Sequence, residues 1–294
     1  MLSRINNEKQ WKDLIRPFST EPMQKGHDGI VKELRELVAD AVRRNIPEER
    51  FGILFSGGVD STLLAKLCKD NGADFICYTS ALAEKGMKEA EDLSYARKAA
   101  KEFGLRLRIK TVSLDETELY IKEVLGIIGK PDVVKVGVAL PFHIAFKVAK
   151  QDKVKVMFSG LGPEELFAGY ERHKQAGNVN KECFDGLLNM YGRDIERDSA
   201  VAGFHKIDLR APYLDREVIE YSLRIPAELK LNSKGNKVIL REAAEQLGLG
   251  RFAWRKKRAA QYGSRFDRAI QRLSKRNGFK YKKDYLNHLL KLLK

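Results

Sequence analysis

The hexapeptide SGGVDS at residues 56–61 combines the residue types that a phosphate site needs. An apolar run from Phe51 to Phe55 precedes it and a helical pattern from Thr62 to Cys68 follows, which predicts a turn between a buried strand and a helix. The adjacent glycines let the backbone approach an anion, and the free N–H groups of the first helical turn would point at it. Asp60 is unexpected beside an anion unless a cation bridges the two, and Mg²⁺ is the usual bridge.

The glycine spacing separates this loop from two common nucleotide-binding motifs. No Gly-Lys-Ser/Thr follows the glycines, as a Walker A loop requires, and their spacing is not that of the dinucleotide fingerprint. A second stretch of similar character, SGLGPEELFAGY at residues 159–170, follows the short apolar run Val154–Phe158. Acids just beyond the carboxyl end of a strand can face the same crevice as the first loop. We therefore expect the two stretches to share one site.

The segments that must position these loops alternate between strand and helix. A packed helix is predicted over Ile30–Ala41, where apolar residues recur with the 3.6-residue period. Further elements are predicted as follows: strands over Asp74–Thr79, Leu105–Val112 and Val154–Phe158, and helices over Glu89–Phe103 and over Pro141–Ala149, with Pro141 near the helix start. This alternation predicts an α/β fold in which a parallel sheet is flanked by helices.

The chain divides into three segments by pattern. Residues 1–28 are polar and are expected to form a peripheral N-terminal arm, residues 29–170 the nucleotide-binding α/β core, and residues 171–294 a mainly helical part. Four apolar residues of the arm are spaced as on a short helix: Trp11, Leu14, Ile15 and Phe18. In the helical part, residues 208–215 are expected to be irregular and residues 265–294 to form a basic helical tail.

Several motifs, taken in order, resemble those of the asparagine synthetase family, in its synthetase domain. Residues 56–61 resemble the pyrophosphate loop of the N-type ATP pyrophosphatase (PP-loop) superfamily, and residues 159–170 resemble the SGEGSDEVFGGY-type loop of asparagine synthetases and β-lactam synthetase. Further matches follow in the same order: Arg197-Asp198, RAPYLD at 210–215, KVILRE at 237–242, RKK at 255–257 and QYGS at 261–264. The match spans about residues 48–264 and implies the adenine nucleotide alpha hydrolase-like fold.

The resemblance implies an ATP-dependent, AMP-forming carbon–nitrogen ligase. Such an enzyme binds ATP with Mg²⁺, activates a carboxylate as acyl-AMP, releases pyrophosphate and lets ammonia attack. Aspartate is the small-molecule substrate that the family implies, with amino-acid biosynthesis as the setting. Two alternatives stay open: an enzyme of the same superfamily that adenylates tRNA bases, and a nucleotide-binding protein that has lost catalysis.

The resemblance also implies a role for each matching residue. The departing pyrophosphate would be held by the first loop: Ser56, Gly57, Gly58, Asp60 and Ser61. Asp60 and Glu164 would bind Mg²⁺ and Lys237 would neutralise charge on the α-phosphate, so these three are the expected catalytic residues. Further contacts to ATP are expected from Ser159, Gly160 and Lys257, and contacts in the adenine region from Tyr78, Thr79 and Ser80. Structural roles are expected for Glu165, at a helix N-terminus, and for Arg210 and Asp215, as a buried ion pair.

Two departures from the family pattern concern the nitrogen donor and the acceptor. The family's glutaminase nucleophile is a cysteine at the second position, where this chain has Leu2, so ammonia is expected free or from a glutaminase partner subunit. The family's glutamate in SGEG is Leu161 here, and leucine can neither accept a proton nor pair with a charged substrate. We therefore expect the ATP-handling half of the site to be intact and the acceptor half to be changed.

Composition limits the remaining possibilities. With 43% apolar residues the chain can form a sizeable core, but no apolar run approaches the roughly 20 residues of a membrane span. No signal peptide is expected from the polar residues 1–10, so the predicted location is the cytoplasm. Cys68, Cys77 and Cys183 have apolar neighbours and are expected to be reduced core residues. The net charge of +15 either suits RNA as a partner or is only a basic surface around an ATP site.

Overall fold

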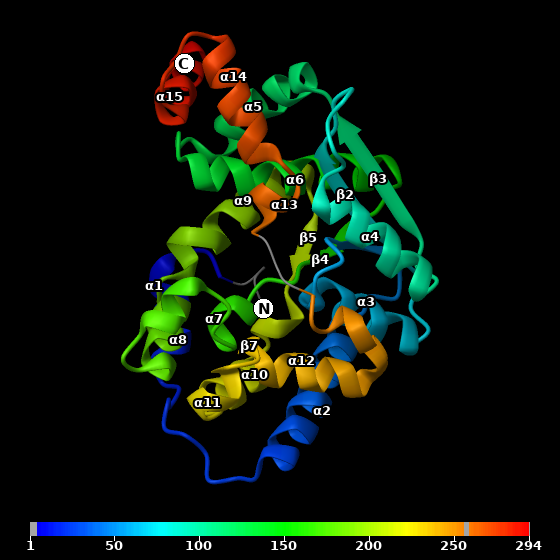
Figure 1. The fold of residues 1–294 in the computed structure, drawn as a ribbon, viewed down its shortest axis with the longest axis vertical. Helices are drawn as coiled ribbons and strands as arrows, with labels where there is room; N and C mark the ends of the chain where they lie inside the picture. The colour runs from blue at the N-terminus through cyan, green and yellow to red at the C-terminus, as the bar shows by residue number, and fades with distance from the viewer. Residues whose placement is uncertain (1–4, 256–258, 294) are drawn as a thin grey trace.

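The computed structural model describes residues 5–255 and 259–293 and contains one five-stranded parallel sheet, in the order β3-β2-β1-β4-β5 (Figure 1). The strands are β1 (Phe51–Leu54), β2 (Phe75–Leu82), β3 (Leu107–Val112), β4 (Val156–Phe158) and β5 (Asp208–Arg210). Two further short strands, β6 (Leu231–Asn232) and β7 (Gly235–Asn236), pair antiparallel. The predicted α/β class, a parallel sheet flanked by helices, is confirmed.

Helices surround the sheet and make up most of the chain beyond residue 170. The helices of the first part are α1 (Glu8–Ile15), α2 (His27–Asn45), α3 (Val59–Asp70), α4 (Glu91–Glu102), α5 (Leu114–Ile128), α6 (Val133–Gln151) and α7 (Pro163–Leu166). Those of the second part are α8 (Val179–Leu188), α9 (Glu196–His205), α10 (Arg216–Leu223), α11 (Ala227–Lys230), α12 (Val238–Ala244), α13 (Ala260–Gly263), α14 (Phe266–Arg276) and α15 (Lys282–Leu292).

The alternating side chains of the strands build a separate apolar cluster on each face of the sheet. Phe51 and Ile53 of β1 pack in one cluster with residues of α2, α3 and α12, whereas Leu54 packs in the other with residues of α5, α6 and α14. The same alternation separates Val156 from Met157 in β4. Figure 1 shows the corresponding helices on opposite sides of the sheet. Because both faces are covered, the central strands β1 and β4 consist only of apolar residues and glycine, as is usual in parallel sheets.

Two elements differ from the sequence prediction. The helix predicted to begin near Pro141 begins at Val133, because the Asp132 side chain accepts a hydrogen bond from the Lys135 N–H and caps it there, so that Pro141 lies inside α6. Residues 208–210, expected to be irregular, form the edge strand β5, which pairs in parallel with β4. Three residues are too few for an alternating pattern to be detected in the sequence.

The N-terminal segment, expected to be a peripheral arm, contributes to the core. Trp11 of α1 is fully buried and its indole Nε1 donates to the Leu187 carbonyl at 2.7 Å. The expected pair of Arg210 and Asp215 is not formed. The Arg210 side chain donates to Asp208 and to the Asn45 carbonyl, while Asp215 caps α10 and pairs with Arg44.

Two expectations about whole-chain properties can be compared with the structure. Cys68, Cys77 and Cys183 are all buried and unpaired, as predicted, and burial raises the pKa of each thiol. Across residues 5–255 and 259–293, no helix combines the length and the apolar character that crossing a membrane would require.

Candidate functional site

The two glycine-rich stretches meet at the point where the strand order of the sheet reverses. Strands β1 and β4 are neighbours there, and each ends at its carboxyl end in one of the two loops. Ligands of open parallel sheets bind outside such a switch point. A cavity of about 870 Å³ opens there, and the predicted site residues that line it are Ser56, Gly58, Asp60, Ser61, Tyr78, Thr79, Ser80, Ser159, Gly160 and Glu164.

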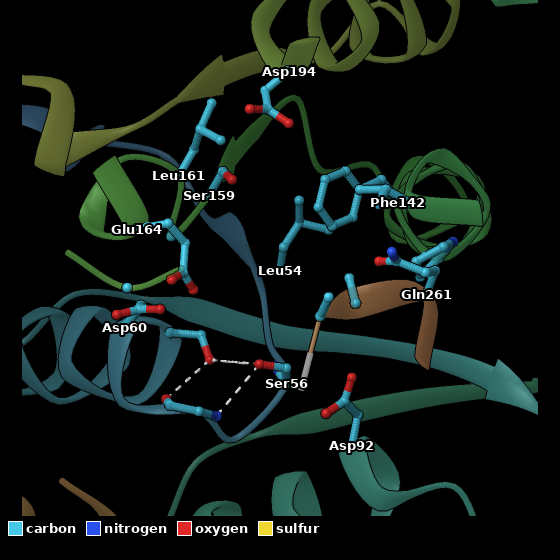
Figure 2. Close-up of a pocket in the computed structure, with 18 of the residues that line it drawn as sticks. Leu54, Ser56, Asp60, Asp92, Phe142, Ser159, Leu161, Glu164, Asp194 and Gln261 are labelled. Carbon is cyan, nitrogen blue, oxygen red and sulfur yellow. Dashed lines mark hydrogen bonds between the residues drawn. The ribbon is translucent and has the colours of Figure 1, made fainter. Parts of the chain in front are cut away.

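The first loop holds its shape through its own serines and through one close backbone contact. Ser56 Oγ accepts from the Gly58 N–H and lies 3.4 Å from Ser61 Oγ (Figure 2). Gly57 has a φ of +66°, and a Cβ there would lie 2.6 Å from the backbone carbon of Tyr95. Only glycine fits both conditions. Gly58 is the N-cap of α3 and offers no side-chain cap, so the α3 N-terminus meets the cavity with backbone donors.

The second loop packs directly against the first. A Cβ at Gly160 would lie only 3.2 Å from Cβ of Asp60, so a larger residue there would require the two loops to move apart slightly. The Tyr213 hydroxyl donates to the Asp60 carbonyl at 3.0 Å and so helps to hold the first turn of α3 in place. In Figure 2, Asp60 of the first loop and Glu164 of the second lie side by side and Ser159 stands beyond them. The two stretches line the same cavity, as expected from the sequence.

Lys237 joins the two loops electrostatically. Its Nζ lies 2.8 Å from Oδ2 of Asp60 and 2.9 Å from Oε1 of Glu164. The lysine side chain is 1% exposed, and the carboxylates are 8% and 14% exposed. The buried ammonium bridges two carboxylates beside a set of backbone donors, which is a suitable arrangement for a phosphate that arrives with a cation.

The backbone around Lys237 positions its side chain. Lys237 has a φ of +55° at the N-cap of α12, and its N–H donates to the Phe167 carbonyl at 3.1 Å. Gly169 gives the side chain room: a Cβ at position 169 would overlap the Glu164 carboxylate and lie 2.5 Å from Cε of Lys237. The left-handed conformation of a non-glycine residue at this point indicates strain that the surroundings maintain.

The residues predicted for the adenine region lie in β2 with differing orientations. The Tyr78 hydroxyl donates to Asp152 at 3.0 Å, so its polar end is engaged away from the first loop. Thr79 Oγ1 donates to the Phe55 carbonyl, and Ser80 Oγ donates to the Pro141 carbonyl at 2.9 Å. All three line the cavity. Lys257, expected to contact ATP, lies outside the described residues.

A largely buried ionic cluster in the cavity wall was only partly foreseen from the sequence. It consists of Glu165, Arg193, Asp194, Arg197 and Asp198, all of which line the cavity. Glu165 pairs with Arg193 as well as lying at the start of α7, and burial raises its pKa to about 7. Burial likewise raises the pKa of Asp198 to about 6. The run of alternating charges at 193–198 was the available signal, but a solvated helix face gives the same pattern.

A second set of contacts to the first loop comes from Arg255. Its guanidinium donates to the Ser56 carbonyl at 2.6 Å and to Asp92 at 2.9 Å, and it stacks over the Tyr95 ring at 3.8 Å from the centroid. Arg255 is 7% exposed, so this side chain holds the loop rather than lying in solvent. The sequence placed Arg255 in a basic segment but gave no indication of this bridging role.

The donor set near the first loop can be tested against Mg²⁺. Within residues 5–255 and 259–293, no group of three or more His, Cys, Asp or Glu side chains is placed to hold a metal. Mg²⁺ is commonly held by one or two carboxylates together with substrate phosphates and water. Asp60 and Glu164 are two such carboxylates beside a phosphate-type loop, so the residues fit an ion that arrives with a phosphorylated ligand.

Comparison with known proteins identifies the family. A family model described as asparagine synthase matches residues 33–185 and 175–278. The chain therefore belongs to the asparagine synthase family. It is 33% identical to the putative asparagine synthetase (glutamine-hydrolyzing) 1 of Methanocaldococcus jannaschii, over 96% of this chain and 59% of the relative. The asparagine synthetase (glutamine-hydrolyzing) of Gallus gallus is 30% identical, over 80% of this chain and 43% of the relative.

The chain spans about half the length of the curated relatives it matches. Two solved structures are similar at lower identity. The U34-tRNA thiolase NcsA from Methanococcus maripaludis aligns at a TM-score of 0.40 and 15% identity, over 90% of this chain and 80% of that chain. NMN synthetase from Francisella tularensis aligns at a TM-score of 0.36 and 13% identity, over 88% and 98%.

Proposed function

We propose that the protein is an ATP-dependent, AMP-forming ligase that activates a carboxylate for attack by a nitrogen nucleophile. The observation that carries this proposal is the buried group of Asp60, Lys237 and Glu164 at the edge of the glycine loop. An ammonium and two carboxylates at a phosphate-type loop suit the binding of a triphosphate with its cation. The ammonium would also stabilise the charge that develops when the bond between the α- and β-phosphates breaks. Membership of the asparagine synthase family supports the same reaction class.

In this proposal the first loop holds the β- and γ-phosphates through backbone N–H groups and the hydroxyls of Ser56 and Ser61. Asp60 and Glu164 would hold Mg²⁺, which neutralises charge on the phosphates when bound. Ser159 and Gly160 contact the ribose or α-phosphate, and the adenine lies against β2 near Thr79. The cavity of about 870 Å³ is large enough for a nucleotide and a small acceptor together.

The first chemical step forms the mixed anhydride. A carboxylate oxygen of the acceptor attacks the α-phosphorus, the bond to the oxygen between the α- and β-phosphates breaks, and pyrophosphate leaves with that oxygen and its electron pair. The ammonium of Lys237 stabilises the charge that grows on these oxygens. In the second step a nitrogen nucleophile attacks the carbonyl carbon, AMP departs and the nitrogen loses a proton.

The acceptor side determines which carboxylate is used. Leu161 and the ionic cluster of Arg193 and Asp194 both line the cavity, and Figure 2 shows Leu161 and Asp194 in the same part of it. Leu161 cannot take the proton that the attacking nitrogen loses. Aspartate is the acceptor that the family implies, with free ammonia or a glutaminase partner as the nitrogen source. An RNA acceptor is the alternative, in which case the same adenylation is directed at a base.

The test is pyrophosphate release from MgATP in the presence of a panel of acceptors. The panel contains aspartate and other amino acids, other small carboxylates and bulk transfer RNA, each with ammonium or with glutamine. Acceptor-dependent release of pyrophosphate with equal formation of AMP is the expected result. Release of ADP and phosphate, or nucleotide binding without turnover for every acceptor, would overturn the proposal. Asparagine among the products would identify the acceptor as aspartate.

A further inference from the structure

The positive charge of this protein is concentrated in its last segment. Residues 251–294 contain 15 Lys or Arg and 2 Asp or Glu, a net charge of +13, whereas the whole chain carries +15. The preceding 250 residues are therefore nearly neutral. A charge asymmetry of this size within one chain is typical of a surface that meets a polyanion.

Helix α14 presents part of this charge as a continuous stripe. Arg268, Arg272 and Lys275 are exposed and recur at intervals of four and three residues, so they lie on one side of the helix. With a rise of 1.5 Å per residue they span about 10 Å, the rise of about three nucleotides along one strand. Among residues 5–255 and 259–293, none of these three cations has an ion-pair partner.

Other basic residues of the same segment form ion pairs. Arg276 pairs with Asp115 and Glu118 of α5, and Lys282 pairs with Asp267. These pairs hold α14 and α15 against the rest of the protein. The three stripe residues, in contrast, point into solvent, which leaves their charge available to a partner. Exposed Lys280 and Lys283 extend the same charged region toward α15.

Exposed aromatic rings accompany the cations. Tyr262 and Tyr281 are 54% and 59% exposed, one before α14 and one after it. Aromatic side chains interleaved with Arg and Lys are the usual means of stacking unpaired bases beside a bound phosphate backbone. At this exposure their rings contribute little to the core.

The stripe also begins beside the cavity. Helix α13 lies between the cavity and α14, and its Gln261 points into the cavity (Figure 2). From there α14 rises to α15 at the end of the molecule (Figure 1). A polyanion bound along α14 would therefore pass the cavity rim.

We propose that the exposed face of α14, continued by Lys280 and Lys283, binds the phosphate backbone of a nucleic acid. A membrane surface fits this face less well, since an interfacial helix must expose its apolar side. In α14 that side is fully occupied: Phe266, Ala269, Ile270 and Leu273 are all 0% exposed and pack in the core.

The test measures binding of fluorescein-labelled bulk transfer RNA, and of RNA and DNA hairpins of the same sequence, as a function of salt. Binding should weaken with a log–log slope of about −3 or steeper between roughly 50 and 200 mM salt. The variant R268E/R272E/K275E should bind at least about tenfold more weakly, with a slope shallower by about 3. The matched control K9E/K32E/K155E reverses the charge of three exposed lysines elsewhere and should retain the parent slope.

If both triple variants lost the same binding affinity, the effect would come from net charge alone and the proposal would be overturned. A flat salt dependence of the parent, or binding to phosphatidylcholine–phosphatidylserine vesicles with none to nucleic acid, would overturn it as well. A preference for the RNA hairpin over the DNA hairpin, or equal binding to both, supports it and identifies which backbone is used. Because all three stripe side chains are exposed, ATP binding and the unfolding transition should be unchanged in the variant. The readout is independent of the ligase reaction.

Discussion

The ammonium of Lys237 lies 2.8 Å from the carboxylate of Asp60, although 177 positions separate the two residues in the chain. The same ammonium is 2.9 Å from Glu164, so it satisfies two buried acids from two different loops. The three charges are therefore coupled to one another, and the group has to be perturbed with substitutions that keep its shape.

Asp60→Asn should lower the rate of pyrophosphate release by at least about 100-fold with the fold intact, because the amide keeps the size of the carboxylate but loses the charge proposed to hold Mg²⁺. Lys237 still has Glu164 as a partner in this variant. Pyrophosphate release and the thermal unfolding transition are measured together. Asp70→Asn, at the exposed end of α3, serves as the control. Parental turnover in Asp60→Asn would exclude the metal role.

Lys237→Met should destabilise the protein by about 3–5 kcal/mol, because it removes the ammonium that Asp60 and Glu164 share in a buried ionic group. The two remaining carboxylates should then attract a divalent cation without nucleotide, so Mg²⁺ should raise the Tm of this variant more than that of the parent. The double variant D60N/K237M removes one of the two acids and should lose most of that response. An equal effect of Mg²⁺ on parent and Lys237→Met would count against these carboxylates as ligands.

Leu161→Glu tests the proposal that Leu161 marks a changed acceptor. If aspartate is the true acceptor, a carboxylate at this position should raise asparagine formation by about tenfold or more, since general-base assistance is typically worth 10²–10⁴ in rate. Leu161→Gln, which cannot take the proton, is the control. No gain in Leu161→Glu would indicate another acceptor. Brisk asparagine formation by the unaltered protein at neutral pH would instead show that Leu161 does not mark a changed acceptor.

Lys230→Met should stabilise the protein at neutral pH. Lys230 is 0% exposed, its Nζ has no hydrogen-bond partner in the described part of the chain, and burial lowers its pKa to about 8 from the usual 10.5. Below pH 8 Lys230 is charged in both the folded and the unfolded state, so the folded state carries the full cost of burying the ammonium. Between pH 8 and 10.5 the folded state releases its proton first, so the penalty shrinks as the pH rises.

The gain from Lys230→Met should accordingly be about 1–3 kcal/mol at pH 7 and smaller at pH 10, measured by urea unfolding at both values. Lys155→Met, at an exposed lysine, should change stability little at either pH. A variant that is less stable than the parent at pH 7 would show that the ammonium of Lys230 is compensated in the folded protein.

Trp11→Ala should lower the free energy of unfolding by about 3–5 kcal/mol, because it removes a fully buried indole and its hydrogen bond to Leu187. Chemical denaturation gives the difference directly. Asp13→Ala, on the exposed side of the same helix, should cost little. A small effect of Trp11→Ala would mean that α1 is the peripheral arm that its polar composition suggests.

The sequence predicts the parallel sheet well because each of its central strands is an apolar run followed by a helical pattern. It also predicts the two loops, since glycines between a strand and a helix have a specific geometric use. The strand β5 and the true start of α6 were missed. One is too short for a period to show, and in the other a side-chain cap at Asp132 outweighs the usual position of proline at a helix start.

The site was predicted in its residue types but not in its contacts. Asp60, Glu164 and Lys237 were each expected, yet that an ammonium would lie between the two acids depends on the path of the chain over 177 positions. The bridging role of Arg255 and the burial of Glu165 and Asp198 were missed for the same reason. Tertiary burial decides whether a charged residue is a solvated surface group or part of a network, and local sequence does not encode burial.

A substitution at Gly169 would perturb the site around Lys237 while leaving the charge of the protein unchanged. A methyl group at this position would displace the Glu164 carboxylate and Lys237 without adding or removing an ionisable group. An allele encoding Gly169→Ala would thus produce a chain with the parental isoelectric point and the parental basic face on α14. In a cell, a phenotype shared by this allele and a deletion would be traced to the proposed ligase site, whereas a phenotype of the deletion alone would be traced to some other activity of the chain.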